Sequence, residues 1–373
     1  MNRYKDIPFF HKKAEEVYDL LSGGRLFAYR DDGLFARLSC FANAIRVSRT
    51  LNLPAPVGLW ESGDFGGNLD HGYRESFSEV FGWGESIEVR EAKGGAEGAK
   101  TFTWPFLCVI DEEDPGEVLH DLATIVGEIQ IRSPYCEPVN EALDELRSWG
   151  PGTGVHCRAG DVEDKIEWMF RKGYPTSFWG AFFRQQGRAE PDSKFYVASN
   201  SVGLRAKAAE YLGDRVRTVD DFISLGDIKQ SQLVLDYADN LLFAQSVCLV
   251  GCGFSSFVAF ACMRSEVLPT SPLEKLPDEL SEAYVDLNNL WKCRYLSDVS
   301  HLIGYQLEHS PIAEQLRSEG YELEEDQTKS KWTRRFQGVL RRLRRTWLSL
   351  RGSRRGENRL HKIHARFFRF SRW

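Results

Sequence analysis

The stretch Val155-His156-Cys157-Arg158-Ala159-Gly160-Asp161 brings a histidine, an arginine and an aspartate close together. The apolar residues at its start predict a short strand, so the polar side chains stand where that strand ends. Open α/β sheets bind ligands at this edge, and a guanidinium offers a planar pair of donors to phosphate oxygens. The stretch therefore favours a phosphate site. A surface pair of Arg158 and Asp161 beside a core histidine explains the same spacing.

A second candidate is Gly251-Cys252-Gly253-Phe254-Ser255-Ser256, which follows a predicted strand and precedes a predicted helix. Glycines allow a ligand to approach the backbone closely, and free N–H groups at a helix start attract a diphosphate. Gly253, Ser255 and Ser256 are thus candidate donors to a nucleotide. A tight turn packed in the core is the alternative.

Acidic side chains follow the first stretch, namely Asp161, Glu163, Asp164 and Glu167. A carboxylate among them is a candidate general base for an acceptor hydroxyl. We select Asp161 and Glu163, together with Arg158, as the catalytic candidates. A solvated helix face accounts equally well for any single acid.

The acidic run Asp111-Glu112-Glu113-Asp114 invites comparison with the DxD metal site of metal-dependent transferases. Pro115 follows directly, and proline is favoured at the first position of a helix. We therefore interpret the run as a turn and a helix start. The other histidines, including His71, His120, His301 and His309, lack ligand-like spacing and are assigned structural roles.

The elements that must position these residues alternate between strand and helix, which indicates parallel α/β architecture. In the first half we expect strands at Leu26–Tyr29, Val57–Trp60 and Phe106–Ile110, helices over Leu34–Ile45, Val118–Ile129 and Val139–Leu146, and a loop over 85–100. In the second half we expect strands at Gly154–Cys157, Phe195–Ala198, Val216–Val219 and Val247–Val250, and helices at Glu163–Phe170, Leu204–Leu212 and Gln232–Phe243.

Length and composition agree with this organisation. The chain has 373 residues, which predicts about two to three folded domains. Of these residues 42% are hydrophobic and 27% charged, so the chain is neither disordered throughout nor a rod. We predict an N-terminal α/β domain (1–150), a C-terminal α/β domain (151–300), a closing helical segment (301–328) and a tail (329–373). The P-loop, HExxH and GxSxG signatures are absent from the sequence.

Two features bear on the compartment. The N-terminus has no apolar run of secretory length, and the eight cysteines lack disulfide or zinc spacing, which predicts reduced thiols in the cytosol. Leu241–Met263 carries no charge and is long enough to span a bilayer as a helix. Its glycines, serines and β-branched run favour a helix end, a strand, a glycine turn and a second helix instead.

The net charge of −6 is unevenly distributed. Residues 329–373 carry 16 basic residues and one acid, Glu357, a net charge of +15, which leaves −21 for the rest. From Trp332 to Leu350 apolar residues recur at helical spacing among arginines, a pattern typical of helices at membrane surfaces. We expect the tail to bind an anionic membrane from the cytoplasmic side. Docking on the acidic body is an alternative, and nucleic acid is the weakest interpretation.

Four blocks between about residue 25 and residue 265 together resemble the nodulation fucosyltransferase group, which is related to core α1,6-fucosyltransferases and protein O-fucosyltransferases. The blocks are Asp32–Leu38 with Val57–Trp60 and Phe77–Phe81, then Val155–Asp161 as an HxRxxD signature, then Tyr196–Ser201, and last Leu233–Asp236 with Gly253–Phe257. The resemblance implies a GT-B fold with two Rossmann-type domains. It also implies inverting, metal-independent transfer of fucose from GDP-fucose to a glycan or lipid-linked glycan in polysaccharide biosynthesis, without a cofactor.

The same resemblance implies roles for single residues. His156 and Asp236 would contact the guanine, Arg158 and Ser255 or Ser256 the β-phosphate, and Arg37 and Asn200 other parts of the GDP-sugar. Asn200 stands where an acid is usual, and Ala36 and Ala159 also depart from the pattern. These departures keep open a catalytically silent GDP-sugar-binding or scaffolding protein, or a transferase that uses another GDP-sugar.

Overall fold

The protein divides into two units, Met1–Ser297 and Asp298–Trp373. The structure, a computed structural model, describes residues 9–30, 33–61, 73, 75–92, 100–158, 176–251 and 255–275, all of which belong to the first unit. The predicted helix Glu163–Phe170, the closing segment 301–328 and the basic tail 329–373 lie outside the described residues.

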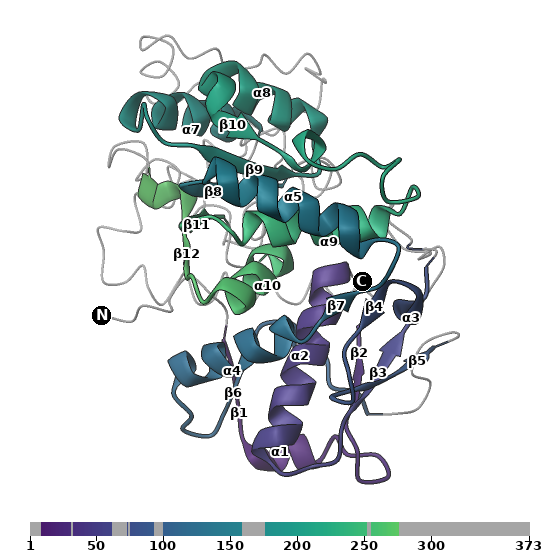
Figure 1. Ribbon diagram of the computed structural model, residues 1–373. Helices are drawn as coiled ribbons and strands as arrows, with labels where there is room; N and C mark the ends of the chain where they lie inside the picture. The colour runs from purple at the N-terminus through teal and green to yellow at the C-terminus, as the bar shows by residue number, and fades with distance from the viewer. Residues whose placement is uncertain are drawn as a thin grey trace, which may run out of the picture. The chain divides into compact units, whose positions relative to one another are not determined.

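The N-terminal half is built around short parallel strands (Figure 1). A three-stranded sheet has the order β2-β3-β5, β1 pairs with β6 in parallel, and β4 pairs with β7 antiparallel. The strands are β1 (Phe9–Lys12), β2 (Phe27–Tyr29), β3 (Val57–Trp60), β4 (Phe81–Gly82), β5 (Glu88–Glu91), β6 (Leu107–Ile110) and β7 (Gln130–Ile131). The helices are α1 (Ala14–Tyr18), α2 (Leu34–Thr50), α3 (Phe77–Val80), α4 (Pro115–Gly127) and α5 (Cys136–Trp149).

Helix α2 is the centre of this half, because every residue from Leu34 to Ser48 is buried. Such a helix must pair its polar groups internally. Asn43 donates to the carbonyl of Phe106 at 2.7 Å and accepts from the backbone N–H of Cys108 at 3.1 Å. These bonds fix α2 against the start of β6.

The C-terminal half is a five-stranded, fully parallel sheet in the order β10-β9-β8-β11-β12. Its strands are β8 (Thr153–Cys157), β9 (Phe195–Ser199), β10 (Val216–Arg217), β11 (Cys248–Val250) and β12 (Pro269–Thr270). Its helices are α7 (Thr176–Ala189), α8 (Val202–Leu212), α9 (Gln232–Phe243) and α10 (Ser256–Ser265), with 3₁₀ turns at Gly213–Arg215, Val219–Asp221 and Pro272–Lys275. The predicted α/β class, with parallel strands in both halves, is confirmed.

Two details of the expected element pattern are wrong. The stretch expected as a loop contains β5, which pairs in parallel with β3. Three of its four side chains are exposed or charged at an edge of the sheet, so the strand leaves no apolar signal in the sequence. The strand expected over Val216–Val219 ends at Arg217, because a 3₁₀ turn starts at Val219 with the Asp221 carboxylate accepting from the Thr218 N–H at 2.7 Å.

The uncharged stretch Leu241–Met263 contains a helix end, a strand and a second helix, as predicted. It contains the end of α9, all of β11 and most of α10, with residues 252–254 outside the description. Among the described helices, none combines the length and the apolar character needed to cross a bilayer. The six cysteines in the described ranges are free thiols, and four of them are buried.

Helix α10 packs against α9 of its own half and also against α2 and α4 (Figure 1). Phe35 of α2 meets Phe257 and Phe260 of α10 with ring centroids 5.0 and 5.5 Å apart. One hydrophobic core therefore runs through both halves. The domain limits at 150 and 300 stay a prediction; Gly150, which ends α5 with a φ of 71°, separates the strands of the two halves.

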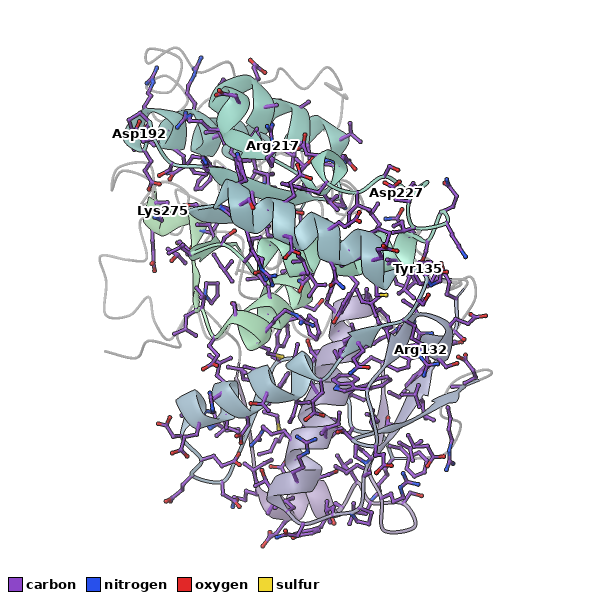
Figure 2. All side chains as sticks on the ribbon, viewed as in Figure 1. Arg132, Tyr135, Asp192, Arg217, Asp227 and Lys275 are labelled. Atoms are coloured by element: carbon purple, nitrogen blue, oxygen red, sulfur yellow. The ribbon has the colours of Figure 1, made fainter. Side chains whose placement is uncertain are left out.

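Short contacts join neighbouring elements around two of the residues labelled in Figure 2, Tyr135 and Lys275. In the turn before α5 the backbone N–H of Tyr135 donates to the carbonyl of Arg132 at 2.9 Å. At the end of the described chain the Lys275 ammonium lies 3.5 Å from the Glu190 carboxylate at the end of α7. The carbonyl of Lys275 accepts from the Gln186 side chain at 2.9 Å, which ties this segment to α7.

Candidate functional site at the switch point of the C-terminal sheet

The strand order of the C-terminal sheet defines where a ligand would bind. The chain starts at the central strand β8, moves outward through β9 and β10, then returns to the other side of β8 as β11 and β12. In open α/β sheets the ligand site lies at the carboxyl ends of the two strands where the direction reverses. Here these strands are β8 and β11, which pair with Val250 beside Val155. The two segments singled out in the sequence thus leave the sheet at neighbouring positions.

His156 and Arg158 lie at the end of β8. The His156 side chain is 8% exposed, and its ring stacks on Phe257 with centroids 4.6 Å apart and planes 15° apart. Within the described part of the chain its Nδ1 has no hydrogen-bond partner. Burial, assisted by the charge of Arg158, lowers the pKa of His156 to about 3, so the imidazole is neutral near pH 7. Arg158 is half-buried at the strand exit.

The turn after β11 comes very close to β8. A Cβ on Gly251 would lie 2.8 Å from Cγ2 of Val258 and 3.4 Å from Cβ of His156, so only glycine fits without displacement. Ser255 then precedes α10 as its N-cap residue and is fully buried. Its hydroxyl lacks a hydrogen-bond partner among the residues that the structure describes. Ser256, half-buried, is the first residue of α10, so both hydroxyls flank the positive end of that helix.

Asp236 lies on the second turn of α9 and receives hydrogen bonds from both halves of the chain. Its Oδ1 accepts from Nε2 of Gln232 at 2.6 Å, and its Oδ2 accepts from the hydroxyl of Tyr73 at 2.6 Å. Tyr73 is 6% exposed. Burial and the neighbouring Asp236 carboxylate raise the pKa of Tyr73 well above its usual value, so the phenol donates the proton.

Arg37 of α2 belongs to the same polar cluster. It is 1% exposed, donates to the carbonyl of Glu61 at 2.9 Å, and lies over the Trp60 ring at 5.0 Å. Its charge acts on Tyr73 in the opposite direction to that of Asp236, lowering the pKa of the phenol. The structure thus brings two predicted site residues, Arg37 and Asp236, to one unpredicted residue, Tyr73. Spacing gives no signal for Tyr73, because it meets α9 only in the folded chain.

A second carboxylate on α9, Asp239, was also not singled out in the sequence. It accepts from the Tyr196 hydroxyl at 2.6 Å. Burial raises its pKa to about 7, against the opposing effect of the Tyr196 hydrogen bond. Strongly raised carboxyl pKa values mark candidate functional groups but also occur in structural pairs. Tyr196 is fully buried in β9, so this pair joins α9 to the sheet.

Of the remaining predicted residues, the structure describes Asn200. Asn200 follows β9 at the same edge of the sheet and is exposed. Asp161, Glu163 and Gly253 lie outside the described residues, as do the neighbouring acids Asp164 and Glu167. Their predicted roles therefore stay predictions.

The run Asp111–Asp114 has the structural role expected for it. Asp114 is the N-cap of α4 and accepts from the N–H groups of Gly116 and Glu117 at 2.8 and 3.3 Å. Glu113 forms a paired contact with the buried Arg46 at 2.8 and 3.0 Å. Over the described ranges no group of three or more histidine, cysteine or acidic side chains could hold a metal ion.

No model of a known protein family matches the chain, and no curated protein sequence is significantly similar to it. Among solved structures, NodZ α1,6-fucosyltransferase soaked with GDP-fucose aligns at 12% identity and a TM-score of 0.37, over 69% of this chain and 92% of that chain. Fucosyltransferase NodZ from Bradyrhizobium aligns at 12% identity and 0.39, over 65% and 93%. POFUT1 in complex with GDP-fucose aligns at 13% identity and 0.29, over 50% and 52%. At these scores neither an activity nor a ligand is transferred to this chain.

Proposed function

We propose that the protein is a glycosyltransferase that binds a GDP-sugar at the carboxyl ends of β8 and β11. One observation carries the proposal: the two segments predicted to hold a diphosphate, far apart in the sequence, leave adjacent strands at the switch point of the sheet. We propose GDP-fucose as the donor and inverting transfer onto a glycan hydroxyl as the reaction, and the resemblance of the ordered sequence blocks supports both.

The residues at this edge suit a nucleoside diphosphate leaving group. When the bond between the sugar carbon and the β-phosphate oxygen breaks, negative charge grows on that phosphate. The guanidinium of Arg158, the start of α10 and the hydroxyls of Ser255 and Ser256 supply fixed positive charge and donors there. His156 is neutral, so its proposed contact with the guanine base uses a ring N–H or lone pair rather than a positive charge. We propose that these groups make the reaction independent of a metal.

We propose further that Asp236 accepts hydrogen bonds from the guanine base, with Arg37 and Asn200 on other parts of the donor. A carboxylate suits guanine, which presents an N–H and an amino group on one edge. On the acceptor side, Asp161 or Glu163 would take the proton of the attacking hydroxyl, and the electron pair of that oxygen forms the new bond to the sugar carbon.

Thermal unfolding with GDP, UDP and ADP tests the donor. We expect GDP alone to raise the melting temperature clearly, since binding to the folded state stabilises it. Equal shifts with all three nucleotides, or none with GDP, would refute the guanine assignment.

Release of GDP from GDP-fucose in the presence of glycan acceptors tests the chemistry. Arg158→Ala should lower turnover at least about 100-fold with an unchanged melting temperature. Arg217→Ala is the matched control, because Arg217 ends strand β10 two strands away from β8. Full turnover by Arg158→Ala would refute its phosphate role. Selective GDP binding without sugar release would instead identify the silent binding protein.

We propose that residues 329–373 attach the protein to an anionic membrane surface on the cytoplasmic side, where lipid-linked glycan acceptors would be reached. The net charge of +15 and the spaced tryptophans of this segment support the proposal. Flotation with anionic liposomes should carry the full chain but not a chain that ends at Thr328. Equal flotation of both would refute it, and flotation of neither would favour docking on the acidic body.

A further inference from the structure

Asp236 accepts hydrogen bonds from two different parts of the fold. Gln232 lies one turn earlier on the same helix and is exposed, whereas Tyr73 belongs to the N-terminal half and is almost fully buried. Both donor–acceptor distances are 2.6 Å. Each carboxylate oxygen thus has its own donor, and together they fix the plane of the carboxylate.

The Tyr73 contact is directional. An ionised carboxylate only accepts, so the phenol must donate to Oδ2. A hydrogen bond to a charged acceptor is about twice as strong as one between neutral groups. Phe81, close by in the N-terminal half, packs edge to face on Tyr237, the residue after Asp236, at 4.8 Å, so α9 is held on this side as well. Tyr73, Phe81 and Tyr237 all belong to the hydrophobic core that joins both halves.

We propose that Tyr73 is a positioning residue that sets the selectivity of the donor site for guanine through Asp236. The inference rests on the proposed function. A carboxylate oxygen can accept more than one hydrogen bond, so the bonds from Gln232 and Tyr73 do not by themselves prevent Asp236 from accepting from the N–H and the amino group of the base. Bidentate acceptance needs a fixed carboxylate plane, whereas a single hydrogen bond tolerates rotation. Tyr73 thus acts on base discrimination more than on diphosphate binding.

The test compares GDP with inosine diphosphate (IDP), which lacks the amino group of guanine, by isothermal titration of the full-length protein. We expect wild-type protein to prefer GDP by about tenfold or more, the scale of one hydrogen bond to a charged group. Tyr73→Phe removes one oxygen and keeps the ring packing. It should raise the Kd of GDP about tenfold while it changes the Kd of IDP less than about threefold.

Tyr196→Phe is the matched control. It also removes a tyrosine hydroxyl that donates to an α9 carboxylate at 2.6 Å, but that carboxylate is Asp239. A merely structural role for Tyr73 would make both variants alike, with a lower melting temperature and an unchanged ratio of the two Kd values. In an Asp236→Asn background, Tyr73→Phe should have no further effect on that ratio.

Gln232→Met removes a second hydrogen bond to Asp236, from an exposed position, and so keeps the test independent of the buried core. We expect a smaller loss of the GDP preference. A preference unchanged in both Tyr73→Phe and Gln232→Met, or a wild-type protein that binds GDP and IDP equally, overturns the inference. Either result leaves the proposed function standing provided that GDP still binds in preference to UDP and ADP.

Discussion

Substituting Gly251 with alanine probes the close approach on which the candidate site depends. The new methyl group would meet Cγ2 of Val258 at 2.8 Å, about 0.6 Å inside ordinary contact, and Cβ of His156 at 3.4 Å. Gly251 does not have a positive φ angle, so the cost of alanine at this position comes from steric overlap and not from backbone strain. Overpacking by one methyl costs about 1–3 kcal/mol, and the loss of glycine entropy in the unfolded chain returns about 0.4–1 kcal/mol.

The expected net loss in the free energy of unfolding is therefore about 1–2 kcal/mol, or roughly 3–6 °C in melting temperature. Because the methyl group pushes α10 away from β8, we also expect GDP to bind more weakly. Gly127→Ala is the matched control. Nothing lies within 4 Å of its Cβ position at the end of α4, so alanine there should cost nothing and gain up to about 1 kcal/mol.

A double substitution tests whether Cγ2 of Val258 causes the destabilisation by Gly251→Ala. Val258→Ala removes Cγ2 and by itself should destabilise the core by about 2 kcal/mol. Combined with Gly251→Ala, it opens the space that the new methyl group needs. The free energy of unfolding of the double variant should therefore fall by about 1 kcal/mol less than the sum of the two single losses. Additive losses, within about 0.5 kcal/mol, would show that β11, α10 and β8 do not meet as described.

Three further substitutions test the buried charges. The pKa of His156 is about 3 in the folded chain, below its value in the unfolded chain, so the free energy of unfolding falls as the pH drops below about 6.5. Between pH 7 and pH 5, urea unfolding should show that wild type loses about 2 kcal/mol relative to His156→Gln. Burial raises the pKa of Asp239 to about 7, so the cost of its charge in the folded chain grows as the pH rises above about 4. Asp239→Asn should gain about 4 kcal/mol on wild type between pH 4 and pH 8, and a constant difference would refute the burial argument. Glu113→Gln leaves the Arg46 guanidinium, 2% exposed, without its anion and should lower stability by about 3 kcal/mol, whereas a change under about 0.5 kcal/mol would mean that solvent reaches Arg46.

Local patterns in the sequence predicted most of the elements around the site. The spacing of Leu34, Leu38, Phe41 and Ile45 predicted α2, and short apolar runs predicted β8 and β9. These signals are local, because burial of one face imposes its period on neighbouring residues. Strand β5 gave no such signal, since its side chains lie at an edge and only Val89 is half-buried. An edge strand is identified by its pairing with a neighbouring strand, and a single sequence does not show that pairing.

The candidate site was predictable in its parts but not in its connections. The stretches around His156 and Gly251 stand out through residue type and position after a strand. The hydrogen bond from Tyr73 to Asp236 joins residues 163 positions apart, and nothing near either residue announces the other. Long-range pairs of this kind arise from packing of whole elements, so they become visible only in the folded chain.

Helix α10 connects these observations, because it belongs to both halves at once. Its first residues stand at the switch point, where Ser255 and the helix N-terminus face the edge of the sheet. Its sides contact α2 through Phe35, and near its end Arg264 donates to the carbonyl of Val126 in α4 at 3.3 Å. A group that binds an anion at the start of α10 is therefore fixed by residues of the N-terminal half. Asp236 is fixed in the same way through Tyr73, so the proposed donor site of the C-terminal sheet would depend on the N-terminal half for its geometry and not only for binding an acceptor.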